Sequence, residues 1–274
     1  MRILFDLQGI QGRSGTRGIG QYSFEVVKEL CEQLDGHEIY FLINNCLELQ
    51  QDRVREIQRI QPNGTWIPLD YPTINGEFTT DLEKAARTIR NEAVNAISPD
   101  WVHVCSVVEG FSEPVVGHTF GKYLSTCFFY DAMPAIYPER FLPTPAISDW
   151  YSNRTSTYKN YDAIFTISSI AKAEAVDFLD ISDGVLTTIW GGLNHRKFEN
   201  LQAQDQSNIT CIGSFEERKN LPRLIEAFAA SIPLVEDSAN LILVGKYHGS
   251  ERDLLDTVIK NQNIENRVII KGYL

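Results

Sequence analysis

Short apolar runs alternate with segments of helical periodicity along the whole chain. Turn residues bound each run, and the segments between runs place apolar residues three or four positions apart. This alternation is typical of βαβ units and predicts an α/β protein with doubly wound parallel sheets. Up to residue 190 the pattern predicts strands over 2–7, 38–43, 65–69, 101–106, 124–130, 163–168 and 186–190.

The segments between these strands predict amphipathic helices, which pack one apolar face onto a sheet. Serines open a helix over 168–179, where a side-chain hydroxyl can cap the first turn. In two longer helices, the expected buried positions are Phe24, Val27, Leu30 and Leu34 in the first and Leu82, Ala85, Ile89, Ala93 and Ile97 in the second.

A polar stretch, "HRKFENLQAQDQSN" over 195–208, separates this series from a second one. The pattern therefore predicts a Rossmann-like domain over 1–195, a linker over 196–208 and a second domain over 209–274. The second series is β-α-β-α-β, about half of a doubly wound domain, and its last strand has no helix after it. We expect one face of this sheet to be bare, and the chain to be the front of a longer protein or to associate with a partner or with itself. The predicted elements are strands over 209–213, 240–245 and 267–273 and helices over 220–232 and 250–262.

The formal net charge of −11 argues against nucleic acid as a partner, because a phosphate polymer would be repelled. It also disfavours simple electrostatic docking on anionic lipid. No apolar run has the length of a membrane span. Five scattered cysteines without C-x-x-C spacing indicate buried free thiols, so we expect a cytoplasmic protein.

The stretch "SGTRGIGQYSFEVVKEL" over 14–30 places three glycines just before a helical pattern. Such a loop presents backbone N–H groups to a phosphate at a helix N-terminus. It fits a nicotinamide dinucleotide poorly, because the glycines follow the first strand too late and the second strand ends in Asn44 and Asn45 instead of an acidic residue. A flexible surface loop, a dinucleotide site and a nucleotide-sugar site remain the three interpretations.

Later segments resemble one family. "CIGSFEERKNLPRLIEAFA" over 211–229 resembles a signature of the retaining glycosyltransferases of family four, in which a strand leads through an R-K-N turn to a helix. Other segments resemble the same family in the same order, so the resemblance covers nearly the whole chain. They are "GTRGIGQYSFEVVKEL" (15–30), "FFYDAMPAIYPERFL" (128–142), "YDAIFTISSIAKAEAVDFL" (161–179), "TTIWGGLNHRKF" (187–198) and the strand-helix-strand over 241–274.

The resemblance implies a GT-B fold of two Rossmann-like domains, the second one truncated here, with the acceptor held by the first and the nucleotide-sugar donor by the second. A hexose or deoxyhexose would pass with retention from a GDP-, UDP- or dTDP-sugar to a saccharide or lipid-linked saccharide of a bacterial surface polysaccharide, such as lipopolysaccharide. No D-x-D occurs, so neither a metal nor another cofactor is expected. Peripheral association with the inner membrane face stays open.

The same resemblance assigns the donor diphosphate to Arg218 and Lys219, with Gly18 and Gly20 presenting amides to it from the first domain. Preorganised cations and N–H groups suit a diphosphate that gains negative charge as it leaves. Arg can hold two phosphate oxygens, and Lys acts as a point charge. The alternative is a solvated basic pair beside the preceding "EE".

At the place of the family's His-Asp pair this chain has Tyr130 and Asp131. Tyr130 removes a histidine acid or base from that position. Asp131 follows a strand end, where ligand-binding residues gather, so it either touches sugar or acceptor or caps the next turn. The same topological argument makes Glu109 and Gly110 candidates for the cleft, and Arg17 in the glycine loop joins them on the acceptor side.

Two histidines complete the candidates. His103 lies inside an apolar strand and is interpreted as a core residue, while His118 lies in an uninformative loop. The E-x(7)-E pair of the family's donor site does not occur in 209–274, so we expect this chain to be weakly active or inactive alone. The alternatives are a non-catalytic sugar- or nucleotide-binding module of the same fold and an NAD(P)-dependent oxidoreductase.

Overall fold

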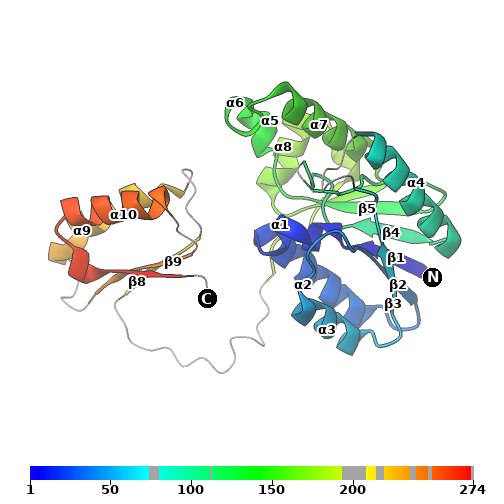
Figure 1. The fold of residues 1–274 in the computed structure, drawn as a ribbon, viewed down its shortest axis with the longest axis horizontal. Coiled ribbons are helices and arrows are strands. Elements are labelled where there is room, and N and C mark those ends of the chain that lie inside the picture. The colour runs from blue at the N-terminus through cyan, green and yellow to red at the C-terminus, as the bar shows by residue number, and fades with distance from the viewer. Residues whose placement is uncertain are drawn as a thin grey trace. The chain divides into compact units, whose positions relative to one another are not determined.

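The computed structural model describes residues 1–73, 80–111, 113–192, 208–213, 219–234, 239–245 and 249–272. Arg218, with the glutamates before it, and nearly all of the predicted linker lie outside the described residues. The chain divides into two compact units, Met1–Leu193 and Asn194–Leu274, each considered by itself (Figure 1).

Unit 1 is built on one parallel sheet with the strand order β3-β2-β1-β4-β5-β6-β7. Each strand is short and mostly apolar, because both faces of a parallel sheet are covered by helices. The strands are β1 (Arg2–Asp6), β2 (Glu38–Asn44), β3 (Thr65–Leu69), β4 (Trp101–Val104), β5 (Leu124–Phe129), β6 (Ala163–Thr166) and β7 (Leu186–Thr188). All seven lie where the sequence predicts them, and most end one or two residues earlier.

Helices cover both faces of this sheet (Figure 1). Alternate residues of β1 point to opposite sides, so Phe5 belongs to the apolar core that includes residues of α2 and α3, while Leu4 belongs to the core that includes residues of α4 and α8. The helices are α1 (Gly12–Gly15), α2 (Gly18–Gln33), α3 (Gln51–Ile60), α4 (Thr80–Ile97), α5 (Met133–Ile136), α6 (Pro138–Phe141), α7 (Pro145–Ser156) and α8 (Ser169–Leu179), with 3-10 turns η1 (Gln8–Ile10), η2 (Thr157–Asn160) and η3 (Asp183–Val185).

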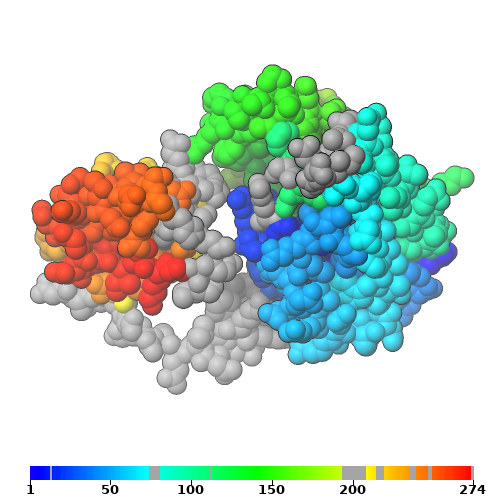
Figure 2. Space-filling view, in the orientation of Figure 1, coloured from blue at the N-terminus to red at the C-terminus, as the bar shows by residue number. Residues whose placement is uncertain are grey.

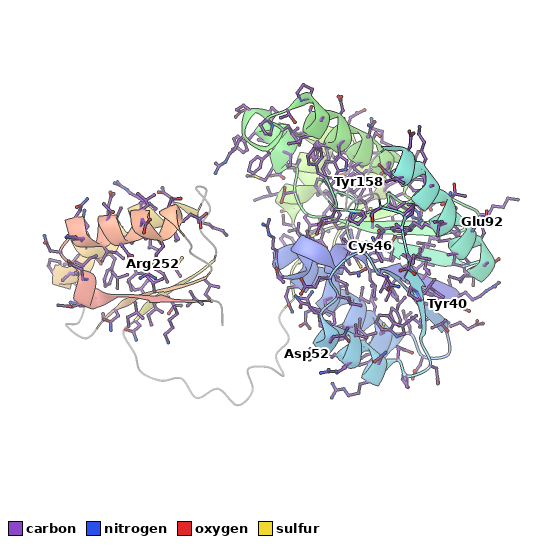
Figure 3. All side chains as sticks on the ribbon, viewed as in Figure 1. Tyr40, Cys46, Asp52, Glu92, Tyr158 and Arg252 are labelled. Atoms are coloured by element: carbon purple, nitrogen blue, oxygen red, sulfur yellow. The ribbon has the colours of Figure 1, made fainter. Side chains whose placement is uncertain are left out.

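Side chains separate into core and surface as these layers require. Tyr158 is buried among its neighbours, while Asp52 and Glu92 stand exposed (Figure 3). The space-filling view shows the blue region around α1 reaching the surface below the green helices α5–α7 (Figure 2). Among the described residues, no helix combines the length and apolar character that a bilayer crossing requires.

Two sequence predictions about side chains are wrong in part. On α4 the buried face is Ala86, Arg90, Val94 and Ile97, so Ile97 is buried as predicted, whereas Ala85 is exposed and Ile89 is 40% exposed. The helix is rotated because Arg90, a charged residue, is buried by an ion pair described below. Among the cysteines, Cys46 is exposed, and all five thiols are free.

Unit 2 has a three-stranded parallel sheet of order β10-β9-β8. Helices α9 and α10 lie on the same face of it (Figure 1) and form a core with the strands. Among the described residues, nothing covers the other face, as the sequence predicts: Ile212 is 78% exposed and Ile269 is 41% exposed. The elements are β8 (Ile209–Ile212), α9 (Leu221–Ser231), η6 (Ile232–Leu234), β9 (Leu241–Val244), α10 (Ser250–Asn261), η7 (Glu265–Arg267) and β10 (Val268–Lys271).

Candidate functional site

The order of the strands in unit 1 reverses between β1 and β4. Strand β1 pairs with β2 on one side and with β4 on the other. In open α/β sheets, ligands bind at such a switch point, outside the carboxyl ends of the strands. The two loops that start there follow β1 and β4, and they contain the glycine loop and Glu109.

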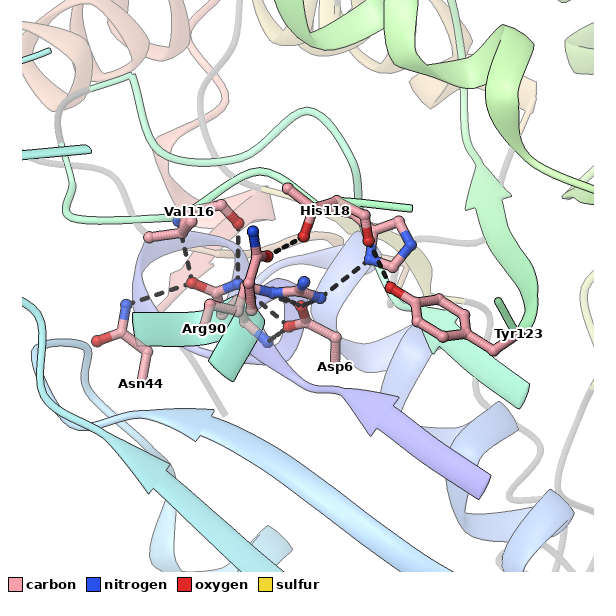
Figure 4. Close-up of polar contacts among 9 residues, drawn as sticks. Asp6, Asn44, Arg90, Val116, His118 and Tyr123 are labelled. Atoms are coloured by element: carbon pink, nitrogen blue, oxygen red, sulfur yellow. Dashed lines mark hydrogen bonds and ion pairs between the residues drawn. The ribbon is translucent and has the colours of Figure 1, made fainter. Parts of the chain in front are cut away.

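A buried ion pair lies beneath this switch point (Figure 4). Arg90 of α4 donates to the Asp6 carboxylate at the end of β1, at 2.7 Å from Nη2 and 3.1 Å from Nε. Its Nη2 also lies 3.0 Å from Nδ1 of His118. Because a guanidinium only donates, that ring nitrogen accepts. Burial, with a further contribution from Arg90, lowers the pKa of His118 well below its usual range, so the ring is neutral.

Amide side chains fasten the loop after β4 to the same place. Gln8 donates to the Val116 carbonyl at 3.1 Å and accepts from the Val116 N–H at 3.1 Å. Asn44, at the end of β2, donates to the Pro114 carbonyl at 2.7 Å and to Gln8 Oε1 at 3.4 Å, and Figure 4 shows the second of these bonds. Asn44 is therefore a fully buried structural residue, where a dinucleotide site would present a carboxylate to a ribose.

The glycines in the loop after β1 have different surroundings. A Cβ on Gly15 would lie 2.6 Å from the Ile10 carbonyl oxygen, and one on Gly20 would lie 2.6 Å from Gly15 Cα and closer still to the Ser14 carbonyl oxygen. The lack of a side chain at these two glycines allows backbone segments of the loop to approach each other closely. A Cβ on Gly18 would meet nothing within 4 Å. Packing therefore explains Gly15 and Gly20 and leaves Gly18 facing open space.

Helix α2 begins at Gly18, so the sequence prediction of a helix start at the glycine loop is confirmed. The N–H groups of Gly18, Ile19 and Gly20 precede the first intrahelical bond, which Gln21 donates to the Arg17 carbonyl at 2.9 Å. Free N–H groups and the helix dipole make such a terminus suitable for an anion. Arg17 is the exposed N-cap residue and makes no side-chain capping bond, which places a cation at the same end.

Glu109 lies beside the glycine loop and is 7% exposed. Its Oε2 accepts a 2.7 Å hydrogen bond from Ser14 Oγ, and Ser106 is the second serine near the carboxylate. Its Oε1 is buried without a hydrogen-bond partner in the structure. Burial raises the pKa of this carboxyl to about 7, and Glu113 adds to the increase, while the two serines and Arg17 oppose it.

Tyr130 fastens α2 to the ends of two strands. Its hydroxyl lies 2.5 Å from Ser23 Oγ and donates to the Cys105 carbonyl at 3.0 Å. Burial raises the pKa of Tyr130 well above its usual value, so the phenol stays protonated. The hydroxyl therefore has a structural partner on each side, and a catalytic role for Tyr130 stays a prediction.

Asp131 and Gly110 both take part in turns. Asp131 is exposed, and its Oδ1 accepts from the Met133 N–H at 3.0 Å, which is the capping role that the sequence left open beside ligand contact. Gly110 has a φ of +86°, and a Cβ there would lie 2.7 Å from Val115 Cγ2. Gly110 is therefore explained by the turn, because a residue with a side chain would not fit there.

In unit 2, Lys219 comes just before α9 and is exposed. Its Cε lies 3.8 Å from the point where a Cβ on Gly213 would stand, so the side chain passes the end of β8. The following Asn220 has a φ of +47° and Pro222 stands in the first turn of α9. Lys219 is thus a cation at a strand's carboxyl end and beside a helix N-terminus, as the sequence predicts.

His103 is a core residue. It is 1% exposed, packs at 4.3 Å against the Phe128 ring and shares a 2.8 Å hydrogen bond with Thr126. Burial lowers its pKa to about 3, so the ring is neutral. Over the described ranges, no group of three or more His, Cys, Asp or Glu side chains is arranged to hold a metal ion.

A hydrogen bond joins α2 to the last described stretch of unit 1. The Tyr22 hydroxyl donates to the Trp190 carbonyl at 3.0 Å. Trp190 is 60% exposed and has a φ of +55°, which is uncommon for a bulky residue. The segment that follows β7 is therefore attached to the helix that begins at Gly18.

Comparisons with known proteins agree with this arrangement. The family described as "Glycosyl transferases group 1" matches residues 194–274. That match covers unit 2. The whole chain is similar to the serotype-specific mannosyltransferase WbdA of Escherichia coli, at 24% identity over 300 residues that include 100% of this chain and 35% of the relative. The chain thus spans about a third of the length of that homologue.

Solved structures show the fold. A glycosyltransferase from Rickettsia africae superposes with a TM-score of 0.65 at 14% identity, over 100% of this chain and 68% of that one. Anabaena Alr3699/HepE, solved in complex with UDP-glucose, gives a TM-score of 0.61 at 14% identity, over 100% of this chain and 69% of that one. The two units therefore have the fold of GT-B glycosyltransferases.

Several residues of the site carry no motif. Asp6, Arg90 and His118 are distant in sequence, and only the carboxylate that interrupts the first apolar run is a signal for them. Ser14 lies inside the quoted glycine loop, yet its contact with Glu109 spans 95 positions and depends on the sheet order. Glu109 is a candidate from the sequence only because it follows the end of a predicted strand.

Proposed function

We propose that this chain carries the first unit and part of the donor unit of a retaining glycosyltransferase. It moves a hexose or deoxyhexose from a nucleoside-diphosphate sugar to a saccharide or lipid-linked saccharide in bacterial surface polysaccharide synthesis. The similarity to a mannosyltransferase makes mannose the first sugar to test. The observation that carries the proposal is the open N-terminus of α2 at the switch point of a GT-B fold, with Arg17 beside it.

The donor diphosphate is assigned to Gly18 and Gly20 in unit 1 and to Lys219 and Arg218 in unit 2. Three free N–H groups at the start of α2 and a lysine at the end of β8 supply positive potential where a leaving diphosphate gains charge. Glu109, Gly110 and Arg17 are assigned to the acceptor or to the cleft at the start of α2, and Tyr130 and Asp131 to the sugar. No metal or other cofactor is required, because helix termini and cations neutralise the diphosphate.

Calorimetric titration of GDP, UDP and dTDP into the chain tests this function. We expect one diphosphate to bind, and Lys219→Ala to weaken it about tenfold or more, because a charge-assisted hydrogen bond to phosphate is lost. Lys260→Ala, at an exposed lysine of α10 in the same unit, is the control and should leave the affinity unchanged.

Binding of none of the three diphosphates would contradict the proposal. Binding without sugar transfer would instead favour the second candidate, a non-catalytic sugar- or nucleotide-binding module of the same fold. Transfer is measured with labelled GDP-mannose and a mannoside acceptor.

A further inference from the structure

Glu109 has a position that the transfer reaction alone does not explain. A carboxyl that is 7% exposed has one oxygen held by Ser14 and the other without a partner. A buried acceptor atom that is left unpaired is costly, and such groups are rare in native proteins. A proton on the unpaired oxygen reduces this cost, because burial of a neutral carboxyl costs far less free energy than burial of a carboxylate.

The contact with Ser14 places this carboxyl next to the predicted phosphate site. The Ser14 carbonyl accepts from the Arg17 N–H at 3.0 Å, and the same carbonyl lies against Gly20. One residue therefore separates the Glu109 carboxyl from the N-cap and first turn of α2. A charge on Glu109 acts directly on any anion bound there.

Among the described residues, ionisable groups from three elements act on Glu109. Glu113 lies on its own loop and opposes its ionisation, whereas Arg17, just before α2, favours it. The Tyr130 hydroxyl, after β5, is the third, and it stays protonated. An ionised Glu109 and a bound phosphate would thus compete for the same cation, Arg17, and repel each other.

We propose that the glycine loop is a proton-coupled anion site, in which a nucleoside-diphosphate sugar binds to the N-terminus of α2 while Glu109 takes up a proton. This rests on the proposed function, because it assumes that the donor's phosphates occupy that terminus. The proton comes from solvent and adds to Oε1, since Oε2 accepts from Ser14. No bond to the ligand forms or breaks in this step.

The direction of the pH dependence follows from the free protein. Burial holds the pKa of Glu109 at about 7 before the donor binds, and the bound phosphates raise that pKa further. Donor affinity is therefore highest below pH 7, falls as the pH rises through the free and then the bound pKa, and levels off above both. The total loss is about tenfold for a unit charge this close to the phosphates.

Calorimetry at about pH 7.5, in two buffers of different ionisation enthalpy, measures the proton taken up per donor bound. The probes are GDP-mannose, UDP-glucose and dTDP-rhamnose, which are phosphodiesters and bind no proton of their own between about pH 6 and 8.5. We expect an uptake of about half a proton per site. Glu109→Gln, which resembles the neutral carboxyl in shape, should bind the donor without proton uptake and with a flat affinity from pH 6 to 8.5.

Glu113→Gln is the matched control, since it removes the same charge from the same loop. It should keep the proton uptake, with the midpoint shifted to lower pH. Wild-type donor binding without proton uptake would overturn this inference and leave the proposed function standing, as would uptake that persists in Glu109→Gln. Failure of all three donors to bind at any pH would overturn the proposed function itself.

Discussion

At the scale of single residues, the charge of Arg90 matters most to the fold. Its side chain is fully buried against Asp6, which is 2% exposed. Removal of one partner from such a pair leaves an uncompensated buried charge. We therefore expect Arg90→Ala to lower the free energy of unfolding by about 3–5 kcal/mol, as measured by urea denaturation.

Arg87→Ala is the control for that measurement. Arg87 lies one turn earlier on α4, is 48% exposed and pairs with Glu83, so its loss should cost less than about 1 kcal/mol. The double variant Asp6→Asn with Arg90→Met should be more stable than Arg90→Ala alone, because no charge is left buried. Equal losses in the two arginine variants would mean that water solvates Asp6.

At the scale of an element, α2 and the loop before it contain two glycines, Gly18 and Gly20, for which we expect opposite effects of substitution by alanine. Gly18→Ala adds a methyl group into open space at a helix start, so the melting temperature should stay within a few degrees of wild type. Gly20→Ala forces a Cβ into the backbone of Ser14 and Gly15 and should lower the melting temperature clearly. Thermal scans of the two variants check this.

The same two variants separate folding from binding. If phosphates approach the backbone at Gly18, a methyl group there obstructs them, and Gly18→Ala should weaken diphosphate binding in calorimetry without loss of stability. Unchanged affinity in a fully folded Gly18→Ala variant would mean that the anion lies elsewhere.

The sequence predicts elements better than it predicts how they rotate. Strand positions follow from apolar runs between turn residues, and the histidine in β4 is correctly interpreted as a core residue. The alternation predicts a helix between β2 and β3, where α3 lies, but "QDRVREIQRI" is mostly polar and does not indicate that Arg53 and Ile57 are its buried residues. On α4 the buried stripe contains Arg90, and its partner Asp6 is 84 positions away, so periodicity alone selects Ile89 instead.

At the scale of the whole molecule, the chain should unfold in parts. Unit 1, Met1–Leu193, and unit 2, Asn194–Leu274, each have a hydrophobic core of their own. Differential scanning calorimetry should therefore show two transitions, with the larger enthalpy from unit 1 because unfolding enthalpy scales with the number of residues.

A scan of residues 1–193 produced alone shows which of the two transitions belongs to unit 1. Their scan should reproduce the larger transition of the full chain and lack the smaller one. A single transition in the full chain, with equal calorimetric and van't Hoff enthalpies, would contradict independent unfolding.

The hydrogen bond from Tyr22 to the Trp190 carbonyl has a mechanical consequence. It attaches the point where the chain leaves the last strand of unit 1 to the helix that carries Gly18. If a ligand that binds to the first turn of α2 tilts this helix, the segment around Trp190 must move with it, or the 3.0 Å hydrogen bond must break. A ligand held only by unit 1 could in this way change the direction in which the chain leaves that unit, without touching anything beyond it.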